Sequence, residues 1–201
     1  HNMASIRALC NHGVLLENGG VKLMGDINDV VKEYLSANIN TELSCVWNNA
    51  DTSNLQDVVL SKVEISDVLG KLKTDFSCDE EVIVNIHLDV RKRVPGLYGC
   101  FYVVRTMDDS VVLTSDSGDF NNHPLENLKV GHNIVSIKIP KRSIGVGKYR
   151  LQLDLASRMN VAGFTVVKSG RICGFEINDY LTSRGNGRQG YFSTLIPWEV
   201  R

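Results

Sequence analysis

The feature that most constrains the fold is the regular alternation of residues 82–90, which read VIVNIHLDV. Side chains on a β-strand point to opposite faces in turn, so a period of two places every second residue on one face. A helix would scatter the same side chains around its axis. The segment is therefore predicted to be a strand with one buried and one largely polar face. The buried positions are predicted to be Val82, Val84, Ile86, Leu88 and Val90.

Other segments after residue 57 show the same period, or short apolar runs between turn residues. Pro95-Gly96, Asp108-Asp109-Ser110 and Gly145-Val146-Gly147 are turn signals of this kind. Short strands at near-regular spacing, with almost no helical period, predict an all-β domain folded as a two-sheet β-sandwich over residues 57–201. Its other strands are predicted at residues 59–65, 72–76, 98–107, 111–113, 134–139, 149–155, 164–167, 173–177 and, in the closing stretch GRQGYFSTLIPWEV, 187–200.

Residues 1–35 have a different pattern. Two short apolar runs, at residues 14–16 and 21–24, flank Asn18-Gly19-Gly20, which predicts a β-hairpin. Asp26 can cap a helix, and the apolar residues from there to Leu35 follow helical spacing. We therefore expect a hairpin followed by one amphipathic helix.

Residues 36–56 are rich in Ser, Asn and Thr, and are predicted to be a linker. Trp47 stands in this polar stretch. We expect its ring to fix the linker to a neighbouring surface, with stacking on a ligand as the less favoured alternative. The sequence thus divides into residues 1–35, a linker at 36–56 and a β-sandwich domain at 57–201.

Composition makes several classes of function unfavourable. The 201 residues carry a formal net charge of -1, so nucleic acid is not an expected partner. Five cysteines without a C-x-x-C pair indicate a reducing compartment and no zinc ribbon. Five histidines show no H-x-H or H-E-x-x-H spacing, so no metal is expected. No apolar stretch reaches membrane-spanning length, which predicts a soluble protein.

Catalytic motifs are also absent. The sequence has neither a Gly-rich phosphate loop with its Lys and Ser/Thr nor a G-x-S-x-G elbow. The acidic groups Asp108-Asp109 and Asp79-Glu80-Glu81 are interpreted as turn residues. A polysaccharide-modifying enzyme with paired carboxylates is thus the least favoured hypothesis, and a binding protein without a cofactor is favoured.

The residues that suit a binding surface are tyrosines, amides and carboxylates on predicted strand faces and loops. Sugars are bound by aromatic rings that stack on their C–H groups and by polar side chains that bond their hydroxyls. For each single residue the alternative is an ordinary solvated surface position. The candidate glycan-binding residues are Tyr98, Tyr102, Asn121, Asn122, Gln152, Asp154 and Tyr191.

Several short matches occur in the N-terminal segment: Leu9-Cys10, Glu17-Asn18-Gly19, Gly25 and Tyr34-Leu35. With them, residues 1–35 resemble the end of an ABC-transporter nucleotide-binding domain. His1 falls where that family has its switch histidine, although His-Asn-Met-Ala-Ser also fits a purification-tag remnant. The Walker A, Walker B and signature motifs are absent from the chain. The resemblance therefore implies that this chain is not an enzyme, and that a full-length parent would use ATP and Mg.

Residues 57–200 resemble the carbohydrate-binding C-terminal domain of the Wzt family, the ATP-binding subunits of O-antigen polysaccharide ABC exporters. The matches are Gly147-x-Tyr149, Phe175-x-Ile177-x-Asp179, Gly187-Arg188-x-Gly190 and Pro197-Trp198-Glu199. The resemblance implies an immunoglobulin-like sandwich that forms a homodimer, binds O-antigen (the lipopolysaccharide O-chain), and works with a membrane-embedded permease at the cytoplasmic face of the inner membrane of a Gram-negative bacterium.

The alternative hypothesis is a dimerisation or docking platform of the transporter without direct glycan recognition. Trp198 is expected to pack the last strand, which could cross to a partner subunit because terminal strands have free edges.

Overall fold

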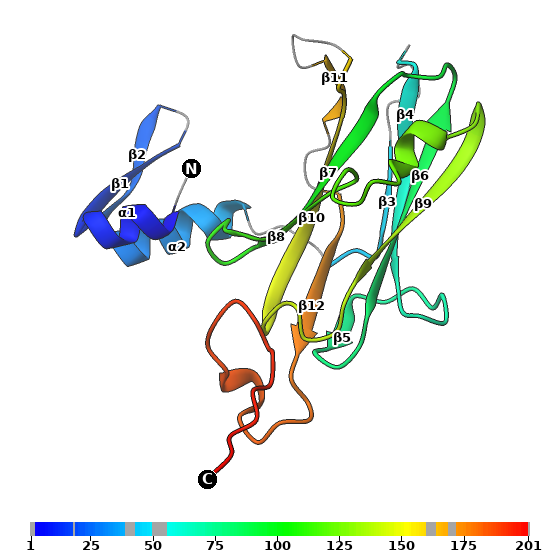
Figure 1. The fold of residues 1–201 in the computed structure, drawn as a ribbon. Helices are drawn as coiled ribbons and strands as arrows, with labels where there is room; N and C mark the ends of the chain where they lie inside the picture. The colour runs from blue at the N-terminus through cyan, green and yellow to red at the C-terminus, as the bar shows by residue number, and fades with distance from the viewer. Residues whose placement is uncertain are drawn as a thin grey trace.

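The computed structural model describes residues 3–17, 19–38, 43–49, 56–159, 164–168 and 172–200. A small N-terminal unit of two helices and a hairpin is followed by two facing β-sheets (Figure 1). The elements of the N-terminal unit are α1 (Met3–Leu9), β1 (His12–Glu17), β2 (Gly20–Asp26) and α2 (Ile27–Asn38). Those that follow are β3 (Val46–Asn48), β4 (Val58–Ser66), β5 (Asp75–Ser77), β6 (Val82–Val90), β7 (Leu97–Arg105), β8 (Val111–Asp116), η1 (Pro124–Asn127), β9 (Gly131–Ile139), β10 (Gly147–Ser157), β11 (Phe164–Lys168), β12 (Gly174–Asn178) and η2 (Gly185–Gly187).

The strands after the N-terminal unit form a four-stranded and a six-stranded sheet. The first has the order β3-β4-β6-β9, and the second has the order β5-β12-β10-β7-β8, with β11 also paired to β10. Neighbouring strands are antiparallel except β12 and β5, which are parallel. The sheets face each other over a common apolar core (Figure 1). The prediction of an all-β, immunoglobulin-like two-sheet sandwich is therefore confirmed.

The core consists of the inward side chains of both sheets. The aliphatic positions predicted on 82–90 are all buried, which confirms that strand. Phe76 and Phe175 are fully buried and meet edge to face, with ring centroids 6.1 Å apart. Tyr149 is also buried, and its hydroxyl donates a 2.9 Å hydrogen bond to the Gly145 carbonyl. A buried tyrosine needs such a partner because an unpaired hydroxyl would be costly.

The segment expected to be a linker contributes to the sandwich. Within residues 36–56, the short strand β3 pairs with β4 at the edge of the four-stranded sheet. Trp47 lies opposite Val63 and packs against the core, as the sequence predicted for its ring. Helix α2 also continues to Asn38, past the expected end at residue 35. The division into domains at 35 and 56 stays a prediction.

The predicted last strand is wrong. Among the described residues 188–200, none belongs to a strand. The main chain is held near its start, where Gly145 N–H bonds the Tyr191 carbonyl and Arg142 bonds the Ser193 carbonyl. Beyond this point Trp198 is 96% exposed and does not pack as expected. An apolar pattern produces a strand only where a sheet edge is available to pair with it.

The N-terminal unit has the predicted hairpin and helix, preceded by α1. Asp26 accepts a 2.8 Å hydrogen bond from the Asn28 N–H at the start of α2. Ile27 and Val31 of α2 form a small apolar cluster with Ile6 of α1. In the described part of the chain, no helix combines the length and the apolar character needed to cross a membrane.

Replacing Phe175 with alanine should lower the free energy of unfolding by about 3–5 kcal/mol, because the ring is fully buried and leaves a cavity. Urea denaturation of the variant and of the parent protein measures this difference. The control is Phe120→Ala, because Phe120 is 78% exposed and its loss should change stability by less than about 0.5 kcal/mol. Similar losses in the two variants would contradict the core described here.

Candidate functional site

The outward side chains of β7 and β10 bring four of the candidate residues together. Alternation along each strand directs Leu151 and Leu153 into the core, so their neighbours point outward. The pairing register places two of these candidates, Tyr102 and Gln152, opposite each other. Asp154 lies opposite Cys100, and Tyr98 lies on the same face opposite Ala156. All four side chains are partly exposed.

Strand β8 and Arg158, the residue that follows β10, complete this surface. Thr114 lies opposite Tyr102, and Asp116 lies opposite Cys100. The guanidinium of Arg158 stands 5.1 Å from the centre of the Tyr98 ring, and its Nη2 lies 3.3 Å from Asp116 Oδ1. We call this surface the tyrosine face and define it as Tyr98, Cys100, Tyr102, Thr114, Asp116, Gln152, Asp154 and Arg158.

Asp116 is a fixed, charged centre of the tyrosine face. The Cys100 thiol donates a 3.0 Å hydrogen bond to Oδ2, and the Gly118 N–H donates one of 2.6 Å to Oδ1. Burial opposes the charged form, but these hydrogen bonds and the Arg158 charge outweigh it, so the pKa of Asp116 lies below its usual value. The carboxylate is therefore ionised at neutral pH.

Two neighbouring groups, the Cys100 thiol and the Tyr102 hydroxyl, have pKa values above their usual values. Burial, together with the adjacent Asp116 carboxylate, raises the pKa of the Cys100 thiol to about 11. Burial and the contact with Cys100 also raise the pKa of Tyr102 above its usual value. The Tyr102 hydroxyl thus keeps its proton at neutral pH and can donate a hydrogen bond to a ligand.

The remaining candidate residues lie elsewhere. Tyr191 packs on Arg105, whose guanidinium carbon is 4.5 Å from the centre of its ring. Asn121 and Asn122 lie in the loop between β8 and η1, and Asn122 lines a cavity between the two sheets. These three residues are not brought to the tyrosine face.

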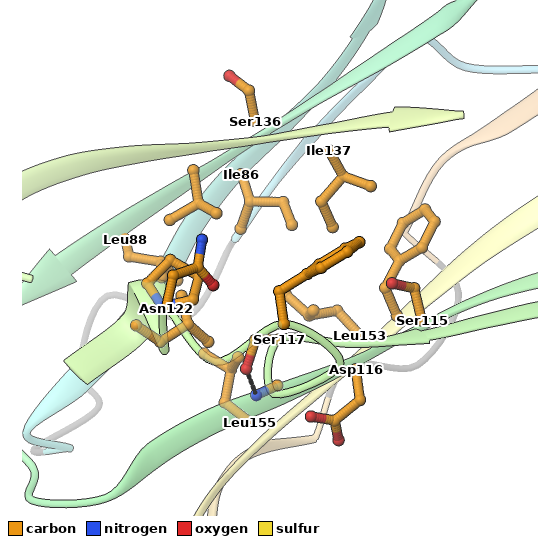
Figure 2. A pocket seen from close by; sticks show the side chains of 16 residues that line it. Ile86, Leu88, Ser115, Asp116, Ser117, Asn122, Ser136, Ile137, Leu153 and Leu155 are labelled. Carbon is orange, nitrogen blue, oxygen red and sulfur yellow. Dashed lines mark hydrogen bonds between the residues drawn. The ribbon is translucent and has the colours of Figure 1, made fainter. Parts of the chain in front are cut away.

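The cavity between the sheets has a volume of about 230 Å³ and is mostly apolar (Figure 2). Ile86, Leu88 and Ile137 line it from the four-stranded sheet, and Leu153 and Leu155 line it from the other. Figure 2 shows the Asp116 carboxylate directed away from these side chains. Polar residues such as Ser115, Ser117 and Asn122 also line it, but a mostly apolar cavity suits a sugar less well than the tyrosine face does, because sugar hydroxyls need hydrogen bonds.

Sequence reasoning missed four residues of the tyrosine face, which are Cys100, Thr114, Asp116 and Arg158. Cys100 stands between Tyr98 and Tyr102, and its outward direction follows from their shared period of two. The strand predicted at residues 111–113 stops short of Thr114 and Asp116, whereas β8 continues to Asp116. Arg158 had no signal in the sequence, because its place depends on the register between β10 and β7.

Because its pKa is about 11, the Cys100 thiol should react slowly with iodoacetamide at pH 8, where only the thiolate attacks. Cys10 is exposed and serves as the internal comparison in the same sample. Mass spectrometry of peptides after timed alkylation measures both rates. Cys100 should be modified faster as the pH rises toward 11, and a Cys100 rate equal to that of Cys10 at pH 8 would contradict the assigned environment.

Comparison with known proteins finds a similar fold. No family profile and no curated protein matches the sequence. The structure is similar to the crystal structure of the C-terminal domain of Wzt, with a TM-score of 0.56 and 7% sequence identity over 79% of this chain and 89% of that chain. A β-D-mannosidase from Dictyoglomus thermophilum gives a TM-score of 0.41 and 14% identity, over 61% of this chain and 13% of that chain. The first likeness shows that this chain has a β-sandwich fold like that of the Wzt C-terminal domain.

Proposed function

We propose that this chain is a non-catalytic domain that binds a polysaccharide, the O-antigen, for export by an ABC transporter. The observation that carries the proposal is the tyrosine face, where two tyrosine rings, an amide, two carboxylates and a guanidinium share one exposed sheet surface. The similarity of the fold to the Wzt C-terminal domain supports the same assignment.

The composition of the tyrosine face suits an extended glycan. Tyr98 and Tyr102 are four residues apart on β7, a separation of roughly 13 Å along the strand. Their side chains can therefore contact different sugar units of one chain. Gln152 can donate and accept hydrogen bonds, and the carboxylate of Asp154 accepts them from sugar hydroxyls.

The N-terminal unit supports the connection to a transporter. The outer face of its hairpin exposes Val14, Leu16 and Met24 at 50%, 65% and 73%. Apolar side chains gathered on one exposed face are typical of a surface that another domain covers. We infer that the rest of a nucleotide-binding domain covers it in a full-length protein. That ATPase would associate with a membrane permease and hold the domain at the cytoplasmic face of the inner membrane.

Calorimetric titration with the O-polysaccharide of the source organism tests the proposal. Selective, saturable binding is expected, with no binding of an unrelated O-polysaccharide. Tyr102→Ala and Gln152→Ala should each weaken the affinity at least about tenfold, because they remove central contacts of the face.

Matched controls locate the site. Tyr180→Ala removes a tyrosine outside the tyrosine face, and Asn85→Ala removes an amide from the outer face of the other sheet. Both variants should bind as the parent protein does. Failure of the folded protein to bind the O-polysaccharide would overturn the proposal, and equal losses in Tyr180→Ala and Tyr102→Ala would reject the assigned surface.

The exposed C-terminal tail favours a second function, a dimerisation or docking platform. Its apolar side chains are largely uncovered within one chain: Phe192 63%, Leu195 51%, Ile196 76%, Trp198 96% and Val200 103%. Residues 194–200, beyond the main-chain contacts of Tyr191 and Ser193, could add to an edge strand of a second copy, where their main chain and apolar side chains would find partners. We therefore propose that the protein is a homodimer held by this tail.

The mass of the protein in solution tests whether it is a dimer and whether the C-terminal tail forms the interface. Light scattering during size exclusion should give the mass of two chains for the parent protein. The double variant Ile196→Asp/Trp198→Asp should give the mass of a single chain. Leu181→Asp is the matched control, since Leu181 is 72% exposed but lies outside the tail, and it should remain dimeric. A monomeric parent protein at tens of micromolar would contradict the dimer, and a dimeric double variant would reject the tail as its interface.

A further inference from the structure

The outer face of the four-stranded sheet carries four side chains joined in a row. His87 on β6 and His132 on β9 face each other, with His87 Nδ1 3.2 Å from His132 Nε2. The second nitrogen of each ring contacts a carboxylate: His87 Nε2 lies 2.9 Å from Glu64 Oε2, and His132 Nδ1 lies 2.8 Å from Asp89 Oδ1. We call His87 and His132 the histidine pair.

The hydrogen-bond roles in this row conflict unless a cation is present. An ionised carboxylate only accepts hydrogen bonds, so each ring donates its N–H to Glu64 or Asp89. A neutral imidazole has only one N–H, and the two facing nitrogens of the histidine pair are then both acceptors. Two lone pairs 3.2 Å apart repel each other. A proton or a metal ion shared by the two nitrogens removes this repulsion.

The charge around the histidine pair favours a cation. The Lys62 ammonium lies 2.6 Å from Glu64 Oε1. One lysine and two carboxylates leave one net negative charge beside the histidine pair.

The geometry resembles that of metal-binding histidines. Zinc binds imidazole nitrogen at about 2.0–2.1 Å, so two tetrahedral nitrogen ligands lie about 3.3 Å apart, close to the 3.2 Å observed here. Histidines that bind metal usually donate their other N–H to a carboxylate or carbonyl, which fixes the ring. Both members of the histidine pair have such a carboxylate.

We propose that the histidine pair binds a divalent transition metal ion, such as Zn²⁺, through His87 Nδ1 and His132 Nε2. In the described part of the chain, no three side chains of the ligating types converge, so the protein supplies two ligands and water completes the coordination. Binding is therefore weaker than at a closed four-ligand site. His132 is 54% exposed, which leaves the ion a path from solvent, and the ion links edge strand β9 to β6.

Titration of the metal-free protein with Zn²⁺, followed by calorimetry, tests this site. One ion per chain should bind saturably, and more weakly than at a closed four-ligand site. His87→Asn and His132→Asn should abolish this binding, and Glu64→Gln should weaken it at least about tenfold, because it removes the carboxylate that orients His87. His12→Asn is the matched control, since His12 is an exposed histidine in the N-terminal hairpin, and it should bind like the parent protein.

A spectroscopic readout distinguishes a specific site from loose association. Zinc should shift the NMR resonances of His87 Nδ1 and His132 Nε2, while the hydrogen-bonded nitrogens keep their protons. Absence of saturable zinc binding would overturn the proposal and leave a shared proton as the cation between the rings. Unchanged binding by folded His132→Asn would overturn it as well.

Discussion

The packing of the inward side chains of β10 against those of β6 is the contact on which the rest of the structure depends. Leu153 and Leu155 face Ile86 and Leu88 across the space between the sheets. Each such side chain contributes roughly 1.5–3 kcal/mol when it is fully buried. A slip of one residue in either strand would expose the whole set, so burial fixes the register. The outward side chains are then fixed too, because they alternate with the buried ones.

The two outer faces that result have different chemistry. The tyrosine face presents rings and hydrogen-bonding groups of a kind that suits sugars, and a charge-assisted set, Asp116, Cys100 and Arg158, holds one side of it in place. The opposite face presents the histidine pair between two carboxylates. A sandwich can carry two such surfaces because only its inner faces are needed for the core.

Two exposed apolar surfaces lie outside the sandwich core, one on the hairpin and one on the C-terminal tail. The hairpin exposes one apolar face while its other face lies against α2, where Gly13 approaches Ile27 and Val30, and the C-terminal tail exposes apolar side chains along its length. In both places the sequence has the composition of a buried element. The proposals of a covering nucleotide-binding domain and of a second subunit assign a partner to each surface.

The sequence alone determined the local structure of this protein. The period of two in 82–90 and 149–155, and the turn signal Asn18-Gly19-Gly20 in the sequence, correctly predicted strands, faces and a hairpin, because alternation and turn propensity depend only on neighbouring residues. Only the tertiary structure decided which strands pair. It brought Tyr102 to Gln152 and His87 to His132, and left residues 188–200 without a strand. Those outcomes depend on burial between segments that are far apart in the chain, and a local sequence pattern does not specify which distant segments pack together.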